Sequence, residues 1–167
     1  MSDFKTTRAR DAWATIQGYV YQVDLTIQRW LNLESHQILE LECGEDIDIV
    51  SRSLETTNSD EQERLLEQVK HREGKITLKN PAAVTMIACA IEHIKTNPNS
   101  NLFFRYTTNA EATRERLSPI TDNTPGILVW ERIRSGTLQG KLAIARLNNI
   151  RSILKQASQP SKLHDDT

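Results

Sequence analysis

Residues 40–70 read ELECGEDIDIVSRSLETTNSDEQERLLEQVK, and the central sheet is predicted mainly from this segment. Alternating apolar and polar side chains predict strands at 38–43, 47–50 and 65–70, because successive side chains of a strand point to opposite faces of the sheet. The polar insert 55–63 predicts a hairpin loop between the second and third strands. The sequence therefore indicates an antiparallel meander.

Four side chains with ligand chemistry are expected on one face of this meander. Side chains two positions apart point the same way, which places Asp46 with Asp48 on one strand and Gln68 with Lys70 on the next. Two carboxylates can hold a hard divalent cation, an amide can add a neutral oxygen, and an ammonium can lie beside a phosphate. The alternative is an exposed acidic strand end, with Lys70 in a weak surface ion pair.

A long amphipathic helix is predicted before the strands, over residues 7–33. Its apolar residues recur at spacings near three and four: Trp13, Ile16, Val20, Val23, Leu25, Ile27, Trp30 and Leu31. Gln22 lies beside that face, where it either packs or points at a site at the end of the sheet.

A crossover unit is predicted after the third strand. Asn80 is a suitable N-cap and Pro81 a suitable first residue for a helix that ends at Asn97. The expected buried stripe of this helix is Val84, Ile87, Ala88, Ile91 and Ile94. A strand at 102–107 follows, and the order strand, helix, strand predicts a parallel pair.

The remaining segments complete the expected fold. A short helix at 110–117 and a C-terminal helix at 138–157 are predicted, whereas 127–134 is ambiguous. The fold class is α/β, with a mixed central sheet of about four strands flanked by helices in αβββαβ order and a C-terminal helix.

Composition indicates one ordinary domain. The 167 residues are 38% hydrophobic and 26% charged, and this length can bury a core. We expect a domain over 1–157 and a polar tail or linker over 158–167. The two cysteines lack metal-ligand spacing, so a structural zinc site is not indicated. No run approaches the roughly 20 apolar residues of a membrane span, and no signal peptide is evident, so we expect a cytoplasmic protein.

Charge is unevenly distributed, although the net charge is only −1. Residues 34–67 carry eleven acids against two bases, whereas 132–155 carry six bases and no acid. The acidic segment is suited to a metal and the basic segment to backbone phosphate, but both patterns also fit a solvated surface.

The ordered motifs resemble the PD-(D/E)xK, restriction-endonuclease-like nuclease fold. In that fold an acidic residue at the start of one strand precedes (D/E/Q)xK on the next, and Gln68-Val69-Lys70 resembles its QxK branch. The chain is also similar, over about residues 8–130, to the endonuclease domain of CBASS-type and related bacterial antiphage effectors. The segments that carry this likeness are Gly18-Tyr19-Val20-Tyr21-Gln22, Glu45-Asp46-Ile47-Asp48, Gln68-Val69-Lys70-His71 and Thr107-Thr108-Asn109.

The resemblance implies a magnesium-dependent endonuclease for double-stranded DNA, with Mn²⁺ as a substitute metal, acting in antiphage defence. Asp48 would bind the metal, with Asp46 as its close rival, and Gln68 would add its amide oxygen. Lys70 would orient or activate the attacking water and stabilise the phosphate. Gln68 in place of an acid removes one negative charge, so we expect weaker metal binding than in a DxK or ExK site.

Further roles follow from the same resemblance. Glu45 is a candidate metal ligand, Gln22 and Glu42 are candidate supporting residues, and DNA contacts are expected at His71, Arg72 and Lys75. A homo-oligomer is expected, because two active sites cut both strands most easily, together with a sensor or ATPase partner and no membrane. Two rival hypotheses are an inactive nuclease fold that binds nucleic acid and an oligomerisation or partner-docking domain.

Overall fold

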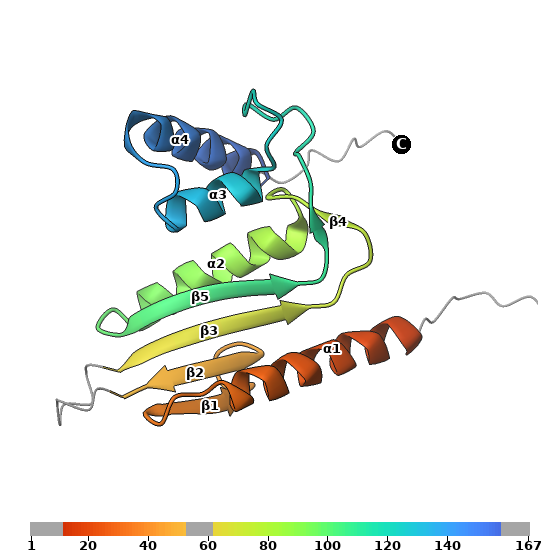
Figure 1. Cartoon of the computed structure of the whole chain (residues 1–167), viewed down its shortest axis with the longest axis vertical. Helices are drawn as coiled ribbons and strands as arrows, with labels where there is room; N and C mark the ends of the chain where they lie inside the picture. The colour runs from red at the N-terminus through yellow and green to blue at the C-terminus, as the bar shows by residue number, and fades with distance from the viewer. Residues whose placement is uncertain (1–11, 53–61, 158–167) are drawn as a thin grey trace, which may run out of the picture. The chain divides into compact units, whose positions relative to one another are not determined.

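The computed structural model describes residues 12–52 and 62–157 of the chain, which divide into two units. The first contains residues up to Arg72 together with Asn101–Thr108, and the second contains Glu73–Ser100 and the residues from Asn109 onward. The described residues form an α/β structure with a mixed four-stranded sheet, a two-stranded sheet and four helices (Figure 1). The predicted α/β class, mixed four-stranded sheet and C-terminal helix are therefore confirmed.

The four-stranded sheet has the order β1-β2-β3-β5. Its strands are β1 Gln37–Leu41, β2 Ile47–Ser51, β3 Glu63–Lys70 and β5 Asn101–Thr108. The first three are antiparallel neighbours, and β5 pairs with β3 in parallel, so the predicted meander and parallel addition are confirmed. The hairpin loop expected at 55–63 lies outside the described residues except for its end, where Glu63 already belongs to β3.

Helix α1, Ala12–Leu31, lies along this sheet (Figure 1). It confirms the predicted N-terminal helix over the described part of its range. Leu25 packs with Ile47 and Val69 from the sheet, and these three residues form the buried cluster between α1 and the sheet. Of the eight apolar residues that the helical spacing singled out, only Leu25 is buried, and the other seven are exposed. The apolar pattern therefore identified the helix but not the side that meets the sheet.

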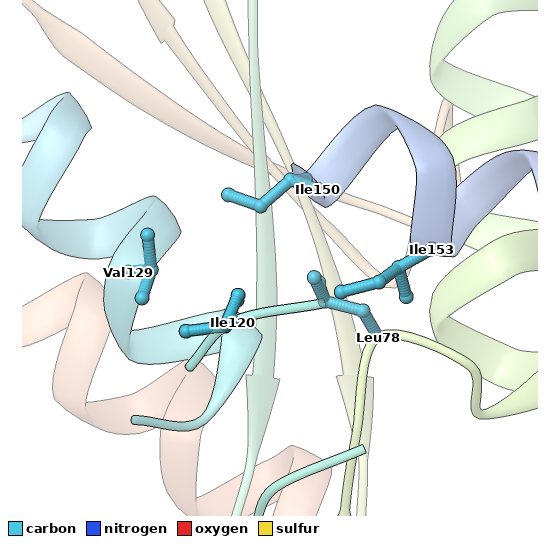
Figure 2. Close-up of a cluster of buried hydrophobic side chains, with 5 residues drawn as sticks. All are labelled: Leu78, Ile120, Val129, Ile150 and Ile153. Atoms are coloured by element: carbon cyan, nitrogen blue, oxygen red, sulfur yellow. The ribbon is translucent and has the colours of Figure 1, made fainter. Parts of the chain in front are cut away.

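The second unit contains the other helices and a two-stranded sheet. Its elements are β4 Lys75–Ile76, α2 Pro81–Thr96, β6 Glu111–Ala112, α3 Gly126–Arg134 and α4 Gly140–Ala157. Its core consists of Leu78, Ile120, Val129, Ile150 and Ile153, which α3, α4 and two connecting segments bring together (Figure 2). Within the described ranges, no helix is both long and apolar enough to cross a membrane.

One local prediction for this unit is confirmed and two are wrong. The Asn80 side chain caps α2 by accepting from the Ala82 N–H at 3.1 Å, as predicted. The expected buried stripe of α2 is wrong: Val84 and Ile87 are half-buried, and Ala88, Ile91 and Ile94 are exposed. The helix expected at 110–117 is wrong. Glu111 and Ala112 instead form strand β6, which pairs with β4. The Thr113 N–H extends this pairing with a hydrogen bond of 2.9 Å to the Ile76 carbonyl.

Candidate active site at the end of strand β3

The carboxylate of Asp46, directly before β2, reaches the end of β3. Its Oδ2 atom accepts a hydrogen bond of 2.6 Å from the Val69 N–H and lies 3.5 Å from Nζ of Lys70. The Lys70 side chain is 43% exposed and that of Asp46 is 17% exposed, so the pair is open to a ligand from solvent. A carboxylate and an ammonium therefore meet at the carboxyl end of β3.

Gln68 and Glu45 extend this group. Nε2 of Gln68 donates to Oε2 of Glu45 at 3.3 Å, and both residues are only partly buried. Gln68 and Lys70 are two positions apart on β3 and therefore share a face, while Glu45 precedes Asp46 in the loop between β1 and β2. The structure thus brings together Glu45, Asp46, Gln68 and Lys70, which we call the β3-end cluster.

Asp48 is placed differently. It is fully buried, and its carboxylate accepts hydrogen bonds from the Gly44 N–H at 2.8 Å, the Glu45 N–H at 3.1 Å and Nη1 of Arg64 at 2.8 Å. Arg64 also binds Glu40 on β1 at 2.9 Å. Although alternation places Asp46 and Asp48 on the same face, the Gly44 loop folds back over Asp48 and Arg64 neutralises its charge. The structure therefore joins Asp46, not Asp48, to Lys70.

Gly44 allows this arrangement because it has no side chain. A Cβ atom at this position would lie 2.5 Å from Cδ2 of Leu66 and 3.0 Å from Oδ2 of Asp48. Both distances are shorter than ordinary contacts, and both neighbours are buried. The loop between β1 and β2 can therefore close over Asp48 only with a glycine here, and this closure also positions Glu45 and Asp46.

The residues expected to support the site or bind DNA lie in several places. Gln22 of α1 donates to Oε1 of Glu42 at 2.8 Å, so these two expected supporting residues contact each other. The His71 ring meets Tyr21 edge-on, with 5.6 Å between the ring centroids. Arg72 is half-buried at the end of the first unit, and Lys75 is exposed in β4 of the second unit.

A buried ion-pair network centred on Glu67 was not predicted from the sequence. Nε and Nη2 of Arg29 each donate to the Glu67 carboxylate at 2.8 Å, and the Thr107 hydroxyl donates to it as well. Burial alone would raise the pKa of Glu67, but the hydrogen bonds from Arg29 and Thr107 and the nearby positive charges lower it below the ordinary value of a glutamate. The hydrogen bond to Glu67 likewise raises the pKa of Arg29. Glu67 therefore remains ionised on the face of β3 that meets α1.

Tyr106 is a second residue that sequence reasoning missed. The parallel register places it opposite Gln68, on the strand next to the cluster. Its phenol oxygen is buried and has no hydrogen-bond partner within the described ranges. Buried hydroxyls usually have a partner, so this phenol is an unusual feature of the strand next to the cluster. The register of β5 against β3 was the missing information.

The donor set of the β3-end cluster limits which metal it could hold. Among the residues described, no three His, Cys, Asp or Glu side chains form a group that could hold a metal ion. Mg²⁺ is commonly held by only one or two carboxylates and keeps several waters. Glu45 and Asp46, with the Gln68 amide beside them, have that chemistry.

Comparisons of the chain with protein-family models, with curated proteins and with solved structures find no match.

Proposed function

We propose that residues 1–157 form a magnesium-dependent DNA endonuclease domain of the PD-(D/E)xK type, in its QxK form. The observation that carries this proposal is the meeting of Asp46 and Lys70 at the end of β3, with 3.5 Å between Oδ2 and Nζ. Next to this pair, Glu45 and Gln68 add oxygen atoms that can bind a metal ion. Carboxylate, amide and ammonium groups in this order match what phosphodiester hydrolysis requires.

The order of the strands also supports the proposal. Helix α1, the antiparallel strands β1, β2 and β3, helix α2 and strand β5, which is parallel to β3, occur in this order along the chain, with the two-residue strand β4 between β3 and α2. This is the αβββαβ order expected of a restriction-endonuclease-like core. The cluster lies where β2 begins and β3 ends, which are the positions of the acidic residue and the QxK triplet in that fold.

Each residue of the cluster has a distinct role in the proposed reaction. Asp46 and Glu45 would hold Mg²⁺ with the Gln68 amide oxygen, and Asp46 takes the role that the sequence alone left open between Asp46 and Asp48. When bound, the metal supplies positive charge beside the phosphate. Lys70 places its ammonium against the phosphate and orients the attacking water. Asp48 contributes by fixing the Gly44 loop from which Glu45 and Asp46 project.

The substrate proposed is double-stranded DNA. His71 and Arg72 directly follow Lys70 and would contact the phosphates on either side of the one that is cut. We place the activity in bacterial antiphage defence, with a sensor or ATPase partner that controls it, because the motifs resemble effectors of that kind. Mn²⁺ is expected to replace Mg²⁺.

Nicking of a supercoiled plasmid tests the proposal. The wild-type chain should nick the plasmid with Mg²⁺ or Mn²⁺ and stop when EDTA is added, and Asp46→Asn and Lys70→Ala should both abolish nicking. Lys95→Ala is the matched control, because Lys95 is an exposed lysine of α2. DNA binding without nicking would instead indicate an inactive nuclease fold, and neither binding nor nicking, with or without a partner present, would indicate a docking domain.

A further inference from the structure

The outward side of α1 carries a continuous apolar stripe. It consists of Trp13, Ile16, Val20, Val23, Ile27 and Trp30, whose exposed fractions range from 38% to 64%. The opposite side of the same helix carries Leu25, which packs on the sheet, and Arg29, which binds Glu67. A helix of a soluble protein usually presents polar side chains on the side away from its sheet. This helix is therefore apolar on two sides, and the sheet covers only one of them.

The stripe has the spacing of a coiled-coil seam. Successive members are separated by three, four, three, four and three residues, which is the alternation of a and d positions in a heptad repeat. Side chains at this spacing form a narrow seam, which one other helix can cover along its whole length. The stripe therefore fits a helical partner.

The order of residues in the stripe is the same in both directions: Trp, Ile, Val, Val, Ile, Trp. In an antiparallel pair of identical helices, Trp13 would meet Trp30 of the second copy, Ile16 would meet Ile27, and Val20 would meet Val23. Each of these three pairs joins an a position of one helix to a d position of the other. The small valines lie at the centre, where two crossing helices approach most closely, and the large tryptophans lie at the ends, where they diverge. We propose that α1 is a dimerisation helix that pairs antiparallel with α1 of a second copy of this chain.

The exposed area of the stripe agrees with a second copy of the chain as its partner. Its six side chains expose on the order of 700 Å² together, close to the about 800 Å² that each partner buries in a stable interface. Patches of this size are rare on monomers. Trp13, Ile16 and Val20 also line one side of an open pocket of about 310 Å³, whose other side includes Tyr21, Asp24 and His71. A side chain of the antiparallel copy would enter this pocket from beside the seam.

Charge does not oppose the pairing. The charged residues of α1 are Asp24 and Arg29, and Arg29 points to Glu67 on the sheet side. In the antiparallel register Asp24 would lie near Gln17 of the second copy, not near another carboxylate. A symmetric pair would therefore bring no like charges together along its length.

The oligomeric mass of the full chain tests the proposal. Sedimentation or light scattering at roughly 100 µM, far above a micromolar Kd, should give twice the monomer mass of 19.1 kDa. Val20→Glu should raise the dimer Kd by more than about a hundredfold, because it buries an unpaired charge at the centre of the seam. Leu142→Glu in α4 is the matched control and should leave the mass unchanged, since Leu142 is equally exposed in the second unit. A monomeric wild type, or Val20→Glu that stays dimeric, would overturn the proposal.

Cross-linking tests the direction of the helices. Val20→Cys and Val23→Cys would each be made with Cys43 and Cys89 replaced by serine, and both positions are exposed in the monomer. A mixture of the two variants should form a disulfide-linked heterodimer on oxidation, whereas each variant alone should cross-link at least about tenfold less. Efficient cross-linking of Val20→Cys with itself would indicate a parallel pair and contradict the antiparallel arrangement. Neither measurement depends on nuclease activity, so this inference and the proposed function can fail separately.

Discussion

Arg29 of α1 binds both carboxylate oxygens of Glu67, through Nε and Nη2, with each distance 2.8 Å. Glu67 lies on β3 directly before Gln68, so the strand that turns Gln68 and Lys70 to one face turns Glu67 to the face that α1 covers. The ion pair thus fixes α1 against the same strand that carries the proposed active site. Packing of the helix and geometry of the site are coupled through β3.

Loss of the Glu67 charge should destabilise the fold. Glu67→Gln leaves the Arg29 guanidinium without its bidentate partner, and the free energy of unfolding should fall by about 2–4 kcal/mol. Urea denaturation at pH 7 measures this change. Glu40→Gln, which removes a more exposed carboxylate from its pair with Arg64, should cost less than about 1 kcal/mol. Equal costs for the two variants would contradict the role given to Glu67.

Stability should also depend on pH through Glu67. Its pKa is lower in the folded protein than that of an ordinary glutamate, so its ionised form stabilises the fold at pH values above the ordinary glutamate pKa. That contribution is lost as the pH falls through the folded pKa. The free energy of unfolding should therefore decline more steeply below about pH 4.5 in the wild type than in Glu67→Gln. Parallel curves for the two proteins would show that Glu67 is not responsible.

Asp46 and Asp48 should separate into a catalytic and a structural residue. Asp46→Asn retains an oxygen for the Val69 N–H but removes a metal-binding charge, so nicking should fall about a hundredfold or more with little change in stability. Asp48→Asn weakens the buried contact to Arg64, so the free energy of unfolding should fall by about 1–3 kcal/mol. Nicking and urea denaturation, measured on both variants, decide between them. The reverse pattern would return Asp48 to the role of main metal ligand.

Gln68→Glu should strengthen metal binding. It restores the negative charge that the QxK form lacks. In the wild type, Nε2 of Gln68 lies 3.3 Å from Oε2 of Glu45, so the carboxylate of the variant would repel Glu45 when no metal is bound. Mg²⁺ should therefore raise the melting temperature more in Gln68→Glu than in the wild type. The Mg²⁺ concentration for half-maximal nicking should fall by about tenfold, which corresponds to about 1.4 kcal/mol. A melting temperature that does not respond to Mg²⁺ in either protein would argue against a metal site here.

Alternation along two strands was enough to predict much of the first unit. It gave the meander and the shared face of Gln68 and Lys70, because the side-chain period of a strand is two residues. The parallel strand followed from the order strand, helix, strand. The alternation could not separate Asp46 from Asp48, since both lie on one face. The difference comes from the Gly44 loop and from Arg64, a neighbour distant in sequence. Arg64 lies beside Asp48 because of the register between β2 and β3, and the alternation of side chains does not specify that register.

Apolar periodicity located the helices but not the surfaces they cover. In α1 the regular stripe from Trp13 to Trp30 is the exposed side, and Leu25 with Arg29 forms the side that meets the sheet. The pattern predicted a helix correctly, yet a seam for a second helix and a seam for a sheet have similar spacing. Around 110–117 the backbone pairs with β4, a contact to a segment more than thirty residues earlier that local propensity could not predict.

The rate of plasmid nicking by the wild type and by Lys70→Ala, at equal DNA occupancy, tests the nuclease assignment most directly. Lys70 is partly exposed and forms its ion pair at the surface, so its loss should leave the fold intact. The assignment predicts Mg²⁺-dependent nicking by the wild type that falls at least about a hundredfold in Lys70→Ala, with unchanged melting temperature. Equal nicking rates for the two proteins, or no nicking by the wild type with Mg²⁺ or Mn²⁺ even with a partner present, would contradict it.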